Sequence, residues 1–419
     1  MKALLLIFDL LFYTFMMRGQ DRWYIGVACL LILPVYTFFV SRALWRSPRK
    51  ALLALGIAGN AGVLMIFKYL GGFTGLAMPL GMSFYVFHMI SLLADSYNKN
   101  LEREPGLVDT MIYGSFFVTV VSGPIIKARD FMKSLSSPRR PDAAAISMGV
   151  QRIAVGLMKK LVIADRLGVA VNAVYDAPMA YSGLSLLFAS FAYSLQIYFD
   201  FGGYSDIAIG VGRILGFDIP ENFNLPYLAS GPSDFWSRWH ISLSSWLREY
   251  IYIPLGGSRK GKARTCINIM ITMLVSGIWH GSTWNFLLWG GLHGLWQVAH
   301  RLFIKERRIS SLISVPVTFL LADLLWIPFR AKDLHDTWII WSRIFTMAGG
   351  ITYIYSYTLI FGAILIAVEL FSKRRLGGQA PVLSADLGTF RGKIVFIMVI
   401  CITVFFAYFG NSAFIYQGF

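Results

Sequence analysis

Two of the six histidines stand where an imidazole could do chemistry. His240 lies in FWSRWHISLSSW and His280 in SGIWHGSTWNF, both among tryptophans and apolar residues. An ionisable side chain at membrane depth costs about 2.5–3.5 kcal/mol on insertion scales, so a buried one usually has a role. Gly277 and Gly281 flank His280 and would let a backbone or a substrate approach closely. These settings indicate functional histidines, and the alternative is a neutral packing histidine that is hydrogen-bonded to a carbonyl.

Two acidic residues are the next most costly to bury in a membrane. Asp200 and Asp206 lie in YFDFGGYSDIAIG, between apolar runs, and each must pair with a base or face water. They could orient a histidine, or they could pair with Arg213 or another base. Other chemistry loses its usual support, because the chain contains no P-loop, GxSxG, HExxH or GxGxxG pattern. Cys29, Cys266 and Cys401 lack CxxC spacing, which predicts no disulfide framework and no metal site.

The composition places these residues in a membrane. Of the 419 residues 56% are hydrophobic and only 14% are charged, which is outside the range of ordinary soluble domains. No long polar insert separates the apolar runs, so we predict one integral membrane domain over 1–419. The 38 Lys and Arg against 22 Asp and Glu give a net charge of +16. These bases sit in short loops between spans, so they report orientation and nucleic acid is not an expected partner.

The predicted fold is all-α, a polytopic bundle of about 10–12 spans, since about 20 helical residues cross a bilayer. The runs around 74–94 and 200–216 carry Gly, Pro or acids, which predicts broken or re-entrant helices there. Lys2–Met17 resembles a signal peptide without a cleavage site, so it is read as a retained first span. The candidate runs are 3–17, 23–41, 51–70, 74–94, 107–126, 150–175, 183–199, 205–216, 266–280, 284–304, 311–329, 351–371 and 394–409.

Basic clusters predict the sidedness. The positive-inside bias puts the richest loops, and with them the N-terminus, in the cytoplasm. A more balanced loop at 330–350 is then outside, and the tail 410–419 ends on the extracytoplasmic face of a cytoplasmic membrane. The clusters are Arg42-Arg46-Arg49-Lys50, Lys127-Arg129-Lys133, Arg259-Lys260-Lys262-Arg264, Lys305-Arg307-Arg308, and Lys373-Arg374-Arg375 with Arg391-Lys393.

The stretch 222–264 differs from its surroundings. It is amphipathic, with Ser233-Asp234 placed to cap a helix, and it interleaves tryptophans with arginines. This predicts one or two helices at or dipping into the cytoplasmic interface, and the alternative is an aromatic belt that only anchors the bundle. The interleaved residues are Trp236, Trp239, Trp246, Arg238 and Arg248.

Long motifs now resemble a known family. SGPI, QIYFDFGGYSDIAIG, NFNLPYLA, SDFWSRWHISLSSWLREYIYIPLGG and GIWHGSTWNFLLWGGLHG are similar to the membrane-bound O-acyltransferase family, in its bacterial polysaccharide O-acetyltransferase branch. The resemblance covers roughly residues 50 to 300 strongly and the rest more loosely. It implies a cone-like bundle with a tunnel, fed by a cytoplasmic acyl thioester. Members usually begin with an additional span, and Lys2–Met17 resembles their second, which puts the N-terminal packing in question and not the active centre.

The resemblance also implies residue roles. His280 matches the catalytic histidine of the family, and His240 takes the second polar position of the active site. Phe414, Tyr416 and Phe419 of FIYQGF match an FxYxxF motif whose tyrosine is proposed to carry the acyl group to a secreted partner. The alternative for Tyr416 is an interfacial anchor. Substrate-binding positions are expected at Trp236, Trp239, Arg238, Asp200, Asp206, Trp279 and Asn285.

The resulting hypothesis is an O-acetyltransferase that passes acetyl groups across the membrane to a cell-envelope or exported polysaccharide, as in alginate or peptidoglycan modification. The donor would be acetyl-CoA or an acyl carrier protein, with no permanently bound cofactor. Expected partners are membrane lipids and an extracytoplasmic SGNH-type transferase, because nothing in the chain resembles a soluble catalytic domain. Alternatives are D-alanyl transfer from a carrier protein toward teichoic acid, and a transporter or flippase.

Overall fold

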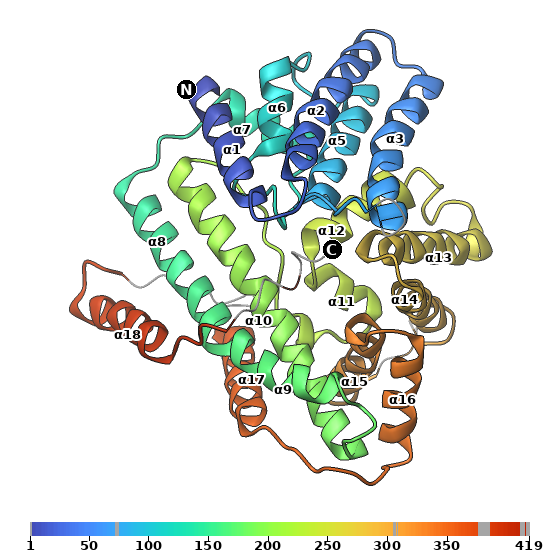
Figure 1. The fold of residues 1–419 in the computed structure, drawn as a ribbon, viewed down its shortest axis with the longest axis vertical. Helices are drawn as coiled ribbons and strands as arrows, with labels where there is room; N and C mark the ends of the chain where they lie inside the picture. Colours follow the sequence, from blue (N-terminus) through green and yellow to red (C-terminus); the bar gives the residue numbers. More distant parts are fainter. Residues whose placement is uncertain are drawn as a thin grey trace. The chain divides into compact units, whose positions relative to one another are not determined.

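The computed structural model describes residues 2–71, 75–304, 307, 309–375, 386–410 and 415 (Figure 1). These residues are helical or irregular, apart from one isolated bridge between Tyr181 and Ile351, so the predicted all-α class is confirmed. The chain divides into two compact units, one of Met1–Val150 with Ala208–Pro220 and one of Gln151–Ile207 with Glu221–Ile415. The single membrane domain and the central tunnel stay predictions.

The first unit is built around α5 (Met82–Tyr97). Every residue from Met82 to Ser96 is buried, because the helix packs against α2, α3, α6 and α7. Gly81 begins this helix with φ 71°, and a Cβ there would collide with the backbone carbonyl of Val120, so only glycine fits the turn. The other elements are α1 (Lys2–Met17), α2 (Trp23–Arg46), α3 (Lys50–Met65), η1 (Ile66–Leu70), α6 (Leu107–Ser115), α7 (Ala128–Ser136) and the start of α8 (Ala143–Met158).

The second unit carries the motif-bearing segments. Two long helical stretches, α8 continued through η2 and α9, and the 33-residue α10, precede a set of short helices. The helical hairpin of α13 and α14 follows, and α15 packs on α14. The elements are η2 (Lys159–Ala164), α9 (Asp165–Tyr175), α10 (Gly183–Leu215), η3 (Pro226–Leu228), α11 (Pro232–Arg238), α12 (Ile241–Leu247), η4 (Arg248–Tyr252), α13 (Gly261–His280), α14 (Trp284–Phe303), α15 (Ser311–Arg330), α16 (Leu334–Phe345), α17 (Ser356–Arg375) and α18 (Phe390–Phe406).

Several helices are suited to a bilayer. Among the described residues, four are long and apolar enough to cross one: Trp23–Arg46, Lys50–Leu70, Gly183–Leu215 and Ser311–Arg330. A helix of 20 residues spans about 30 Å, the thickness of the hydrocarbon core. The total of about 10–12 spans is a prediction that these four helices do not test.

The predicted break near 200–216 is wrong, because α10 continues through Gly202 and Gly203 without interruption. Packing explains the glycine: a Cβ on Gly203 would stand 2.7 Å from the carbonyl oxygen of Gly156, so the two glycines let α8 and α10 approach closely. Both acids of this stretch have basic partners in the second unit, so the helix needs no water-filled break to accommodate them.

Two other predicted elements also differ. The run 107–126 is not one span, because α6 ends at Ser115 and the chain then turns before Ser122-Gly123-Pro124. The more balanced loop predicted at 330–350 contains α16, and Asp333, which precedes the helix, caps it by accepting the Asp336 N–H.

Candidate functional site

His280 is the last residue of α13 and is 1% exposed. Its ring lies against those of Trp279, Trp289 and Phe329, with centroids 4.8, 5.0 and 5.1 Å away. The close approach predicted at Gly277 is real, and it is a backbone that approaches: a Cβ on Gly277 would collide with the carbonyl of Phe286 in α14. Glycine therefore lets α13 and α14 pack tightly enough to enclose the imidazole in aromatic rings.

His240 occupies the junction between α11 and α12. It is 1% exposed and has φ 42°, a left-handed conformation that few residues other than glycine adopt. Its ring meets Phe201 edge-on, with the centroids 4.6 Å apart, and the Trp279 ring lies 6.4 Å away. Trp279 therefore contacts both histidines, and the structure gathers the two predicted catalytic imidazoles around one indole.

Asn222 fixes the tautomer of His240. Its Oδ1 accepts the Ser242 N–H at 3.2 Å, which identifies that atom as the oxygen, and the Nδ2 donates to Ser205 Oγ at 3.1 Å. His240 Nδ1 lies 3.3 Å from the same Oδ1, so Nδ1 carries the proton and Nε2 is a hydrogen-bond acceptor. Burial lowers the pKa of His240 to about 3, which keeps the ring neutral at physiological pH. In this tautomer Nε2 cannot donate to an oxyanion, and an imidazole with so low a pKa is a weak base at neutral pH, so the geometry favours an orienting role.

The predicted tryptophans extend the same aromatic cluster. Trp236 packs against Trp289 at 5.8 Å, and Trp289 in turn covers His280. Trp239 lies 4.9 Å from Trp326, which stacks on Trp289 at 6.0 Å. Trp236, Trp239 and Trp246 are all buried in protein. The position of their segment at the cytoplasmic interface stays a prediction.

The polar members of the prediction are held by the protein itself. Arg238 pairs with Asp234 at 2.6 Å, one turn earlier on α11, and Asn285 donates to the carbonyl of Ala331 at 2.9 Å. Asp234 does not cap the helix as predicted: α11 begins at Pro232, and Asp234 in its first turn accepts the Ser230 N–H instead. The arrangement fixes the α11–α12 turn that carries His240.

Asp200 and Asp206 pair with bases from the preceding helix, and neither pairs with the suggested Arg213. Asp206 binds Arg152 at 2.9 Å and Lys159 at 2.6 Å, and Asp200 binds Lys160 at 2.7 Å. The two lysines belong to η2, a π-helical insertion that brings consecutive lysines onto the facing α10. Such insertions are frequent at functional sites.

The tail is described at a single position beyond Gly410. Tyr416, Phe414 and Phe419 lie outside the described residues, and Ile415 lies within them. The Ile415 N–H donates to Asp200 Oδ2 at 2.7 Å, so the chain returns to the second unit immediately before the predicted acyl-carrying tyrosine.

Three residues of this site escaped the sequence prediction. Asn222 lies in NFNLPYLA, a motif in which no site residue is predicted, and Phe201 lies between the two acids Asp200 and Asp206. His293 of LHG is fully buried, with its ring 4.8 Å from Trp289 and 5.1 Å from Trp236. The available signal was an amide or imidazole inside an otherwise apolar motif.

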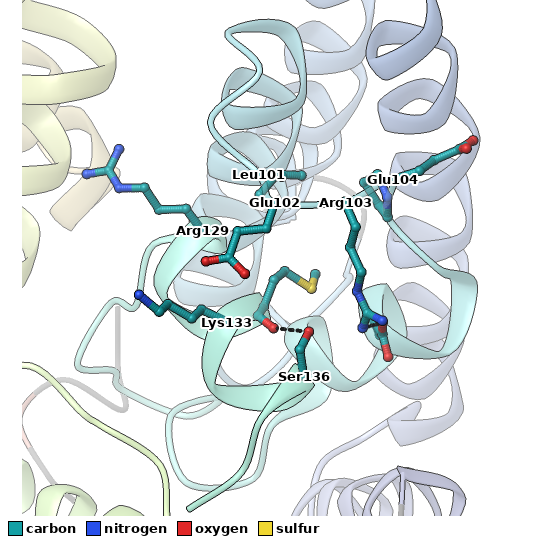
Figure 2. A pocket seen from close by; sticks show the side chains of 10 residues that line it. Leu101, Glu102, Arg103, Glu104, Arg129, Lys133 and Ser136 are labelled. Atoms are coloured by element: carbon teal, nitrogen blue, oxygen red, sulfur yellow. Dashed lines mark hydrogen bonds and ion pairs between the residues drawn. The ribbon is translucent and has the colours of Figure 1, made fainter.

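A separate pocket in the first unit includes no predicted site residue (Figure 2). Figure 2 shows that charged side chains of both signs line it. Arg103 forms an ion pair with Asp109 at 2.6 Å. Ser136 donates to the carbonyl of Met132 within it. Its lining is Leu101, Glu102, Arg103, Glu104, Pro105, Asp109, Arg129, Met132, Lys133 and Ser136. The mixed charges define no ligand class.

Fold and site together define a multipass, all-helical membrane protein that buries two histidines in an aromatic cluster. A model of the MBOAT, membrane-bound O-acyltransferase, family matches residues 14–315, and the chain belongs to this family.

Named relatives cover much of the chain. The "Probable alginate O-acetylase AlgI" of Pseudomonas putida is 35% identical over 309 residues, which are 69% of this chain and 63% of that protein. The "Peptidoglycan O-acetyltransferase" of Helicobacter pylori is 31% identical over 385 residues, 80% of this chain and 72% of that protein. The "Teichoic acid D-alanyltransferase" of Bacillus subtilis is 27% identical over 278 residues, which are 61% of this chain and 69% of that protein. The chain thus spans less than two thirds of the Pseudomonas putida relative.

Proposed function

We propose that this protein is a membrane O-acetyltransferase that takes an acetyl group from a cytoplasmic thioester and passes it across the membrane for O-acetylation of an envelope or exported polysaccharide. The observation that carries the proposal is the enclosure of His280 and His240 around Trp279, within the motifs that the family shares. Relatives with the printed names alginate O-acetylase and peptidoglycan O-acetyltransferase support a polysaccharide acceptor.

The first chemical step would load Tyr416. A phenol has an ordinary pKa of about 10 and attacks poorly at neutral pH, whereas a positioned histidine base typically gains about 10² to 10⁴ in rate. The Tyr416 oxygen attacks the thioester carbonyl, His280 takes the phenolic proton, and the C–S bond breaks. The proton then leaves with the thiolate, so acetyl-CoA and tyrosine give acetyl-tyrosine and CoA.

Each neighbour of His280 then has a role that its environment permits. His240, neutral and held through Nδ1 by Asn222, orients the reacting groups. The indoles of Trp236, Trp239 and Trp279, which are buried, would exclude water and border the acetyl group. An extracytoplasmic transferase of the SGNH type would take the acetyl group from Tyr416 and acylate the polysaccharide.

Labelled acetyl-CoA tests the proposal directly. Purified protein given [¹⁴C]acetyl-CoA should become labelled at Tyr416, and His280→Ala should lower the labelling rate at least about 100-fold. Tyr416→Phe keeps the ring and loses the oxygen, so it should abolish the label. His335→Ala, at an exposed position in α16, supplies the control. Label that persists at Tyr416 in His280→Ala would contradict the mechanism.

D-alanyl transfer is the second candidate, because the Bacillus subtilis relative is named a teichoic acid D-alanyltransferase. The tyrosine motif within this chain favours acetyl, since in that system the motif usually belongs to a separate small protein. Loading of Tyr416 by each donor in turn distinguishes the two functions. Acetyl-CoA should load Tyr416, and D-alanyl carrier protein should not.

A further inference from the structure

Asp200 joins two distant parts of the second unit. Its carboxylate is 2% exposed, in the middle of α10. Oδ1 accepts from Lys160 Nζ at 2.7 Å, and Oδ2 accepts from the Ile415 N–H at 2.7 Å, a bond between residues 215 positions apart. Lys160 also pairs with Asp165 at 2.8 Å. A buried carboxylate is stable only when its oxygens are satisfied, so the tail N–H is part of what makes this charge tolerable.

The tail has a second attachment near the same helical stretch. The Tyr408 N–H donates to the carbonyl of Leu161 at 2.8 Å, and the Arg166 guanidinium donates twice to the carbonyl of Phe406, at 2.9 and 3.2 Å. Leu161 belongs to η2, the same π-helical segment as Lys160. Among the described residues that end or follow α18, Phe406, Tyr408 and Ile415 are therefore each bonded to η2, α9 or α10.

We infer that Asp200, supported by Lys160, is a positioning residue that anchors the C-terminal tail at Ile415, and that loading of Tyr416 depends on this anchor. This inference rests on the proposed function, because it ties the anchor to the reaction of Tyr416. Ile415 directly precedes Tyr416 in the chain, so an anchor at Ile415 limits how far the predicted acyl carrier can move away from α10. Restricting a reactive group in this way raises its effective concentration, and a misplacement of about 1 Å can cost 100-fold in rate.

A purely structural role for Asp200 makes a different prediction. If the carboxylate served only to neutralise Lys160, removing the tail N–H would change nothing in the reaction. Ile415→Pro removes that donor and leaves the Asp200–Lys160 pair in place, because proline has no N–H. Ile415→Val keeps the donor and is the matched control.

Amide hydrogen exchange of the full-length protein in detergent measures the hydrogen bond between Asp200 and Ile415 independently of acetyl transfer. Asp200→Ala removes both acceptor oxygens and should speed exchange of the Ile415 amide by roughly 10- to 100-fold, the factor carried by one hydrogen bond to a charged group. Asp323→Ala is the control: Asp323 is an equally buried acid that binds Ser190 and Ser194 of the same α10 and has no described contact with the tail. Unchanged exchange of the Ile415 amide in Asp200→Ala would overturn the inference.

Acetyl loading completes the test. Asp200→Ala and Ile415→Pro should each lower the loading rate of Tyr416 by at least about tenfold with little change in acetyl-CoA affinity, and the double variant should lose no more than the worse single one. Asp323→Ala and Ile415→Val should load normally. Normal loading in Ile415→Pro would refute the positioning role. If wild-type Tyr416 never loads while the exchange result holds, the proposed function fails and the anchor stands.

Discussion

At the scale of single residues, Asn222 controls the chemistry open to His240. The amide receives one bond from the Ser242 N–H and faces Nδ1 of the imidazole, so the side chain selects the tautomer and the ring angle together. Catalytic histidines often have a hydrogen-bonding partner of this kind at one ring nitrogen. The partner decides which nitrogen carries the proton, and so whether the other nitrogen donates or accepts a hydrogen bond. Sequence alone could not reveal this, since 18 residues separate the two side chains and only the fold joins them.

Substituting Asn222 should therefore impair the reaction more than the fold. Asn222→Ala frees the imidazole to rotate and to change tautomer, and we expect acetyl loading to fall by up to about 100-fold. Asn60→Ala is the matched control, because Asn60 is also a fully buried amide, bonded to Thr37 and the carbonyl of Gly56 in the first unit. Loading rates with melting temperatures check the prediction. Equal losses of loading in both variants would mean that His240 needs no such partner.

At the scale of elements, the glycines of α10 show where sequence reasoning failed. A Gly-Gly pair beside two acids suggested a broken helix, since glycine costs about 1 kcal/mol in a helix relative to alanine. Packing reversed that local preference, because Gly203 admits the backbone of Gly156 and the acids find bases on α8 and η2. Helix ends marked by apolar runs, such as those of α13 and α15, were predicted to within a few residues.

Substitutions of the adjacent glycines Gly202 and Gly203 should have opposite effects on stability. A Cβ on Gly203 would stand 2.7 Å from the Gly156 oxygen and 3.2 Å from Lys159 Cβ, so Gly203→Leu must separate the helices. We expect a loss of several degrees in melting temperature, in keeping with about 1–3 kcal/mol for overpacking. A Cβ on Gly202 would meet only Phe223, at 3.9 Å, so Gly202→Ala should be neutral or stabilising. Melting curves in detergent decide, and a stable Gly203→Leu variant would contradict this packing.

At the scale of the whole molecule, the sequence predicted the fold class and the family better than it predicted the contacts between distant segments. Composition and long aromatic motifs indicated an all-α membrane protein and the family, both of which hold. In the structure His240 and His280, which the motifs singled out, both lie beside Trp279, and their catalytic roles stay predictions. The ion pairs of η2 with α10 and the return of Ile415 to Asp200 were beyond prediction, because each joins residues whose proximity depends on tertiary packing.

The orientation of the chain in the membrane is also a prediction, and it depends on the basic loops. Loops rich in Lys and Arg stay in the cytoplasm because translocating their charge is unfavourable, so Lys262 should be inside and Lys332 outside. Lys262 lies in the first turn of α13, and the rest of α13, then α14 and α15, lead to Lys332. Of these helices α15 is long and apolar enough to cross. With the three native cysteines changed to serine, Lys332→Cys should react with a membrane-impermeant maleimide in intact cells. Lys262→Cys should react only after permeabilisation. The reverse pattern would place the thioester entry on the wrong face, where no cytoplasmic donor could load Tyr416.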